Sequence, residues 1–220
     1  VVNAVPGSAE AFVPCALETV QAAMAGKEGL EAKAAENGTV ITATGSAAHA
    51  STPERGKNAI QMMIALLCEL PLPEGDLSAI SAIKAAYGME YNGESVGLDK
   101  SDESGRLTLN LGLMDWNDKG YALSIDIRAP ISVLEDEIRE KLAASLPMAK
   151  LEDVSFSHGH YVPEDSGTYA RHFNTAVAFG IEREYRENRL HMVDEALNME
   201  DFIEDVKIMA DAIVELACVK

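Results

Sequence analysis

The chain of 220 residues carries 36 Asp and Glu against 18 Lys and Arg, a formal net charge of −18. So acidic a surface repels nucleic-acid phosphates and anionic lipids, which argues against nucleic acid and membrane as partners. The 47% hydrophobic and 25% charged residues are typical of a globular protein. No apolar run approaches the roughly 18 residues of a membrane span.

Three cysteines, Cys15, Cys68 and Cys218, lack the spacing of a metal site. Cys68 and Cys218 lie in helical apolar patterns, so we interpret them as small core residues of a protein in a reducing compartment. The cytoplasm is the expected location. The first residues lack an initiator Met and are typical of the middle of a strand, so we expect the start to be internal to a longer protein.

The first half of the chain is predicted to place one hairpin between helices. A strand over residues 1–5 and a helix over residues 11–24 precede the hairpin, which spans residues 30–44. The Asn-Gly pair at residues 37–38 is a strong hairpin-turn signal. A helix then begins near Gly56. Its apolar face consists of Ile60, Met63, Ile64 and Leu67.

The same plan recurs in the second half. After a helix over residues 76–85, a second hairpin is predicted within residues 107–128. Ser132 and Glu135 have the spacing of a capping box, which predicts that a further helix begins there. A last strand is expected over residues 154–160. The stripe of the capped helix is Leu134, Ile138 and Leu142.

This order of elements predicts an α+β fold. Over residues 1–162 we expect a ferredoxin-like two-layer sandwich built from two related halves. Residues 163–220 differ, with an apolar strand over residues 175–179 and a closing helix capped by Asn198. About 50 residues cannot build a core alone, so we expect them to be one edge of a larger α/β domain. The stripe of the closing helix is Phe202, Val206, Met209, Ile213 and Leu216.

Residues 45–59 are the most specific stretch of the sequence. His49 lies there in a loop of small residues that leave its imidazole accessible. A lone His is more often structural, and this remains the favoured interpretation from the residues alone, although a His in a loop is functional more often than one in an apolar stripe. His158 and His160 share one face of a predicted strand and could chelate a metal. Half-exposed strand residues are the favoured interpretation of that pair, because no acid or third His lies nearby.

The stretch resembles the lid-domain signature Gly-x-x-x-His-Ala-Ser-x-Pro-x-x-Gly-x-Asn-Ala of a zinc exopeptidase family. That family includes aminoacylases, glutamate carboxypeptidase and PepV-type metallo-dipeptidases. Further matches occur in the family's order and favour the PepV-type branch. They are Asn3-Ala4-Val5-Pro6, Asp126-Ile127-Arg128-Ala129-Pro130, Gly167-Thr168-Tyr169-Ala170-Arg171, Val177-Ala178-Phe179-Gly180 and His191-Met192-Val193-Asp194-Glu195.

The resemblance implies a substrate-clamping lid over residues 1–162, followed by a remnant of the catalytic domain over residues 163–220. His49 would donate to the oxyanion of the tetrahedral intermediate. Asn3 and Arg128 would hold the substrate's backbone and free carboxylate.

The same resemblance implies roles in the C-terminal part. Gly167 and Thr168 would donate to the substrate carboxylate, and His191 would be a zinc ligand. From the residues alone, the structural interpretations are favoured: Asn3 finishes a strand, Arg128 pairs with a surface acid, and His191 is a solvated loop residue.

Two departures from the family limit this interpretation. The family's His-x-Asp motif, Glu-Glu pair and further Asp ligand should precede Asn3 and do not occur there. His191 alone cannot form a hydrolytic zinc site. In addition, residues 162–169 lack the helix and strand that the family places before the Gly-Gly-Thr-Tyr loop, and one Gly of that loop.

We therefore expect part of a metal-dependent dipeptidase that hydrolyses small peptides. Zn²⁺ would be bound in the complete enzyme but not by this chain alone, and the chain alone would be inactive. The alternative is a non-catalytic peptide-binding or dimerisation module. In either case a homodimer could form through the lid or through an exposed sheet edge.

Overall fold

The computed structural model describes residues 2–117, 119–152 and 198–218. The chain divides into two compact units, Val1–Asp165 and Ser166–Lys220. The first unit contains every described strand and the helices α1 to α4, and the second contains helix α5, Met199–Cys218.

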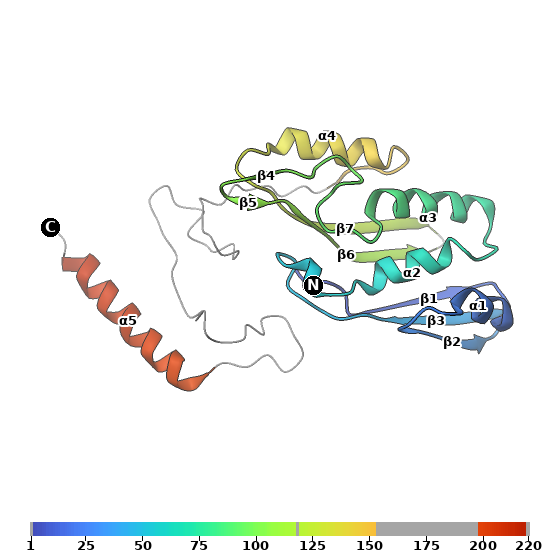
Figure 1. Ribbon diagram of the computed structural model, residues 1–220, viewed down its shortest axis with the longest axis horizontal. Coiled ribbons are helices and arrows are strands. Elements are labelled where there is room, and N and C mark those ends of the chain that lie inside the picture. The colour runs from blue at the N-terminus through green and yellow to red at the C-terminus, as the bar shows by residue number, and fades with distance from the viewer. Residues whose placement is uncertain (1, 118, 153–197, 219–220) are drawn as a thin grey trace. The chain divides into compact units, whose positions relative to one another are not determined.

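A three-stranded antiparallel sheet opens the first unit (Figure 1). β1 (Ser8–Val13) and β2 (Leu30–Ala35) both pair with the central strand β3 (Gly38–Thr44), which gives the order β1-β3-β2. The β2–β3 turn contains Asn37 with a φ of 63°, a conformation that Asn tolerates well. α1 (Leu17–Met24) connects β1 to β2. The antiparallel pairing of β2 with β3 confirms the hairpin predicted over residues 30–44.

Two helices form the centre of the first unit. α2 (Ala59–Leu67) contacts β1, β3 and β6, and α3 (Glu74–Tyr87) packs on α2. Nearly every α2 side chain is buried, including Gln61, whose Nε2 donates to the carbonyl of Gly88 at 2.6 Å. An apolar helix buried on all sides joins the elements on both of its faces into one core.

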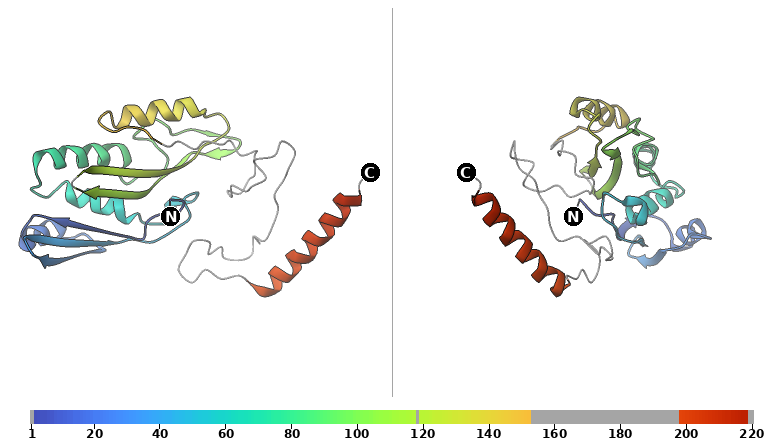
Figure 2. Two further views of the ribbon diagram at one scale, coloured as in Figure 1. Left: turned by 180° about the vertical axis from the view of Figure 1, so that it is seen from behind. Right: turned by 60° about the vertical axis from the view of Figure 1, so that its left-hand side comes forward.

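A second hairpin and its helix lie beside this centre, as Figure 2 shows from behind. β6 (Thr108–Asn117) pairs with β7 (Gly120–Arg128), and α4 (Glu135–Ser145) follows. Two strands of two residues each, β4 (Ser101–Asp102) and β5 (Gly105–Arg106), pair with each other before β6. They were not predicted from the sequence.

One hydrophobic cluster connects these elements. Cys15 is buried and Cys68 partly buried, and both thiols are free. The largest fully buried apolar side chains come from β3, the helices, β6 and the connecting loops. They include Ile41, Ile64, Leu66, Ile83, Leu98, Leu107, Leu109, Leu111, Val20 and Val133.

Two boundaries near the start of the chain were predicted wrongly. Within residues 2–7 the structure has a turn and a single bridge at Ala4 rather than a strand, and β1 begins at Ser8. The helix expected from residue 11 begins at Leu17. Alternate residues Ala9, Ala11 and Val13 face the core along β1, and this period of two overrides the helical pattern seen in the sequence.

The predicted capping box at Ser132 is also wrong. α4 begins at Glu135, with Leu134 as N-cap and without a side-chain cap. The backbone N–H of Ser132 instead donates to Asp102 Oδ2 at 2.8 Å, and Ser104 Oγ donates to Asp102 Oδ1 at 2.5 Å. These hydrogen bonds hold the pKa of the Asp102 carboxyl well below its usual range, and the bond from the Ser104 side chain has the largest effect. The segment before α4 is therefore held by the β4–β5 turn.

The mixed α and β class is confirmed, whereas the ferredoxin-like sandwich stays a prediction. The first and second hairpins lie in separate sheets, and a groove of about 440 Å³ lies between β1 and β6. In the second unit Asn198 caps α5 as predicted, accepting from the N–H groups of Glu200 and Asp201. The apolar side chains of α5 that the structure describes, such as Ile213, are largely exposed.

The strands predicted over residues 154–160 and 175–179 lie outside the described residues. Within the described ranges, no helix is long and apolar enough to cross a membrane.

Candidate functional site

A closed loop after β3 carries His49. Ser46 and Lys57 form a two-residue bridge with N–H···O distances of 3.0 and 2.9 Å, which joins the ends of the loop. A Cβ on Gly45 would collide with the carbonyl oxygen of Lys57, and one on Gly56 would lie 2.8 Å from the carbonyl oxygen of Ser46. Both glycines of the motif are therefore needed for the bridge to close.

The His49 imidazole is half-buried and held by its own loop. Its Nδ1 lies 2.6 Å from Ser51 Oγ and accepts from the Ser51 backbone N–H at 3.2 Å. The N–H of Thr52 donates to the His49 carbonyl at 3.0 Å, which closes a tight turn. Ser51 thus makes two contacts with one nitrogen of the ring.

The segment containing Asn3 pairs with the segment containing His49. Ala4 and His49 form an antiparallel bridge. The N–H of Ala50 donates to the Asn3 carbonyl at 3.0 Å, and the N–H of Val5 donates to the carbonyl of Ala48 at 2.8 Å. The structure therefore brings together two predicted site residues that are 46 positions apart in the sequence.

Two buried asparagines form hydrogen bonds that connect this pair of segments to α2 and β6. Asn58 Oδ1 caps α2 by accepting from Ile60 at 2.9 Å, and its Nδ2 donates to the Leu111 carbonyl at 2.9 Å. Asn110 Nδ2 donates to the carbonyls of Ala4 at 2.9 Å and Val2 at 3.2 Å. The start of α2, strand β6 and the Asn3 segment are thus joined by side-chain hydrogen bonds.

Arg128 ends β7 at the same end of the unit. It lies opposite Thr108 in the β6–β7 register, and Thr108 Oγ1 donates to the carbonyl of Ala50 at 3.3 Å. The Arg128 side chain is 29% exposed, and its Nε and Nη2 contact the two oxygens of Asp126 at 2.7 and 3.3 Å. A two-pronged contact of this kind fixes the plane of the guanidinium.

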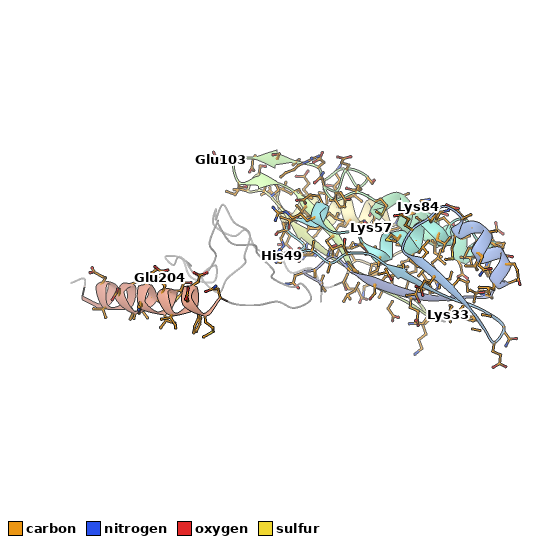
Figure 3. The ribbon with its side chains drawn as sticks, turned by 60° about the horizontal axis from the view of Figure 1, so that its bottom comes forward. Lys33, His49, Lys57, Lys84, Glu103 and Glu204 are labelled. Atoms are coloured by element: carbon orange, nitrogen blue, oxygen red, sulfur yellow. The ribbon has the colours of Figure 1, made fainter. Side chains whose placement is uncertain are left out.

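His49, Asn3 and Arg128 are thus gathered by hydrogen-bonded backbone segments. Figure 3 shows His49 at the opposite end of the first unit from Lys33 of β2. An imidazole, a carboxamide and a guanidinium in one region offer N–H donors suited to a carbonyl oxygen and a carboxylate.

The other predicted site residues cannot be placed. Gly167, Thr168 and His191, together with the His158 and His160 pair, lie outside the described residues. Among the residues that the structure does describe, no group of three or more His, Cys, Asp or Glu could hold a metal ion. The described residues by themselves therefore contain no such donor set for Zn²⁺.

Four residues that shape this region were not predicted from the sequence. Ser51 stands inside the motif, but the motif gave it no role. Asp126 lies two residues before Arg128, and this spacing places both side chains on one face of a strand, which was a usable signal. Asn110 and Thr108 act across more than fifty residues, so no local pattern could have indicated them.

Comparison with known proteins agrees with these motifs. The sequence matches the M20 peptidase dimerisation domain over residues 35–147, just over half of the 220 residues. The chain belongs to the M20 peptidase dimerisation-domain family. His49 and Arg128 lie inside the matched M20 region, and Asn3 precedes it.

Dipeptidases are among the curated relatives of this M20 chain. It is 27% identical to the "Putative dipeptidase YtjP" of Bacillus subtilis over 212 residues, which cover 84% of this chain and 46% of the relative. It is 26% identical to the "Beta-Ala-Xaa dipeptidase" of Lactobacillus delbrueckii over 80% of this chain and 43% of that protein. A "Putative dipeptidase" of Staphylococcus epidermidis is 24% identical over 82% of this chain and 45% of the relative. The resemblance to a dipeptidase family is confirmed, and the chain spans less than half the length of each of these relatives.

Proposed function

We propose that this chain is the substrate-clamping lid of a metal-dependent dipeptidase. Residues 1–162 would form the lid, with ferredoxin-like halves, and residues 163–220 would belong to the catalytic domain. The metal ligands and the general base would lie mainly in a part of the complete enzyme beyond these 220 residues. The relatives named as dipeptidases support this assignment.

The observation that carries the proposal is the gathering of His49, Asn3 and Arg128 at one end of the first unit. Attack on a peptide carbonyl creates a negatively charged oxygen, and the His49 imidazole would donate an N–H to it. Arg128, oriented by Asp126, would bind the free carboxylate of the substrate. The Asn3 carboxamide would bind the substrate's backbone.

These roles predict different kinetic effects in the complete enzyme. The oxyanion exists only after attack, so His49→Ala should lower kcat about 100- to 1,000-fold with little change in KM. A carboxylate clamp acts before and during the reaction, so Arg128→Ala should mainly raise KM. Steady-state kinetics of both variants with a dipeptide substrate measure this difference.

Lys57 is a matched control for His49, and Arg139 is a matched control for Arg128. Lys57 belongs to the His49 loop, but only its backbone takes part in the bridge to Ser46, so Lys57→Ala should keep normal kinetics. Arg139 forms an ion pair on α4 with Glu135, and Arg139→Ala should keep the normal KM. Near-normal kcat in a folded His49→Ala variant, verified by a thermal melt, would show that His49 is only a loop residue.

A second function, homodimer formation, is favoured by the description of the matched family as a dimerisation domain. The outer edges of β1 and β2 have no strand partner among the described residues and could pair with a second copy. Sedimentation velocity over a hundredfold range of protein concentration tests this function. A molecular mass that stays monomeric throughout the range would contradict it.

A further inference from the structure

We propose that Ser51 is a positioning residue that holds His49 in the tautomer with its proton on Nε2. The inference deepens the proposed function and rests on it for its catalytic meaning, since only an Nε2–H that is available to a ligand can stabilise an oxyanion. The geometry of the tautomer itself is independent of that function.

Two contacts converge on one nitrogen of the ring. The Ser51 backbone N–H reaches His49 Nδ1 at 3.2 Å, and Ser51 Oγ lies 2.6 Å from the same atom. A backbone N–H can only donate, so Nδ1 must present a lone pair to it. The hydroxyl can then donate to the same nitrogen along a second direction.

The consequence for the ring follows from its two nitrogens. A neutral imidazole carries one N–H, so an accepting Nδ1 places the proton on Nε2. A proton on Nδ1 would face the amide hydrogen of Ser51 and lose that hydrogen bond. Nε2 is the ring nitrogen that neither Ser51 contact involves.

The loop makes this arrangement rigid. Ala48 and Ala50, on either side of His49, are buried at 5% and 0% exposure. The N–H of Ala50 is bound by Asn3, and the N–H of Thr52 by His49 itself. The direction of the Ser51 N–H is therefore set by a turn whose neighbours cannot move freely. A short, buried turn can hold a catalytic side chain within the narrow range of orientations that catalysis needs.

The tautomer can be measured directly by ¹⁵N NMR of the imidazole in the 220-residue chain. Spectra are recorded at pH ~8, above the ordinary imidazole pKa of about 6.5. The signals of His49 are identified as those that vanish in His49→Gln, which is needed because the chain has 5 histidines. We expect the Nδ1 shift to lie at the unprotonated limit and the Nε2 shift at the protonated limit.

Two variants isolate the hydroxyl of Ser51. Ser51→Ala keeps the backbone donor and removes the hydroxyl, so the tautomer with its proton on Nε2 should remain the major form, while both nitrogen shifts should move part of the way toward the average of the two tautomers. Ser51→Thr keeps a hydroxyl and should restore the wild-type shifts. Amide spectra that are unchanged beyond the loop verify that each variant is folded.

The outcomes separate this inference from the proposed function. A protonated Nδ1 in the wild type, or wild-type shifts in Ser51→Ala, would overturn the inference whatever the enzyme does. In the complete enzyme, Ser51→Ala should lower kcat roughly twofold to tenfold, the scale of one neutral hydrogen bond, with rescue by Ser51→Thr. If the NMR result holds while His49→Ala keeps normal kcat, the tautomer stands and the proposed function fails.

Discussion

At the scale of a single residue, the proposed role of Arg128 in binding a carboxylate depends on its contact with Asp126. One edge of its guanidinium, Nε with Nη2, is already engaged by Asp126, and the pair is mostly shielded, with side-chain exposures of 29% and 17%. The contact fixes the orientation of the donors that remain. Asp126 also brings a carboxylate that could compete with the carboxylate of a substrate for Arg128. The direction in which KM changes when Asp126 is substituted therefore distinguishes the two effects.

Removing the charge of Asp126 distinguishes positioning from competition. In the complete enzyme we expect Asp126→Asn to raise KM roughly threefold to tenfold with a smaller effect on kcat, because an unfixed Arg side chain must lose rotamer entropy when it binds. Steady-state kinetics with one dipeptide substrate measure both constants. A lower KM would show that Asp126 competes with the substrate.

At the scale of elements, α2 is placed by its N-cap residue. Asn58 is 3% exposed and combines an N-cap with hydrogen bonds to the Asn110 side chain and the Leu111 carbonyl. The cap alone could be supplied by any short polar side chain. The tertiary bonds require the carboxamide N–H₂ group, which is the physical reason for Asn in this position of the motif.

Two substitutions of Asn58 separate the cap from the tertiary bonds. Asn58→Ala should lower the free energy of unfolding by about 2–3 kcal/mol, since it removes the cap and the buried hydrogen bonds together. Asn58→Asp keeps a capping acceptor but turns a carboxylate toward the acceptors of Asn110 and Leu111, so it should destabilise the fold at least as much. Urea unfolding measures both. A near-neutral Asn58→Asp would show that the cap is the whole effect.

The β4–β5 turn provides a pH-dependent contribution to stability. Hydrogen bonds from Ser104 and Ser132 lower the pKa of Asp102 from 3.8. A carboxylate with a lowered folded-state pKa stabilises the fold above its unfolded pKa, and this contribution is lost as the pH falls further. Asp102→Asn should therefore reduce Tm at pH ~7, and the difference from wild type should shrink below pH ~4. A difference in Tm that stays constant down to pH ~2 would contradict the linkage.

At the scale of the whole molecule, the chain corresponds to less than half of the dipeptidases that it matches. We expect the purified 220-residue chain to show no dipeptidase activity with added Zn²⁺, Mn²⁺ or Co²⁺, because the proposed function assigns most metal ligands and the general base to a part of the enzyme outside these 220 residues. Assays with each metal and a dipeptide substrate test this. Metal-dependent turnover that is lost in His191→Ala would overturn the expectation.

Several features were determined by the sequence alone. Local patterns predicted both hairpins, all five α-helices (the first with a misplaced start) and the Asn198 cap, because turn residues and apolar spacing act over a few positions. The motif around His49 and the ordered matches along the chain identified the family, since they depend on residue identity rather than on contacts.

Other features were decided only by the tertiary structure. Pairing of residues 8–13 with β3 converted a predicted helix start into a strand, and Asp102 displaced the expected cap at Ser132. The approach of Asn3 to His49 needs a bridge between distant segments, which Asn110 supports from β6. Hydrogen bonds between residues far apart in the sequence form only when the core closes, so local patterns carry no record of them.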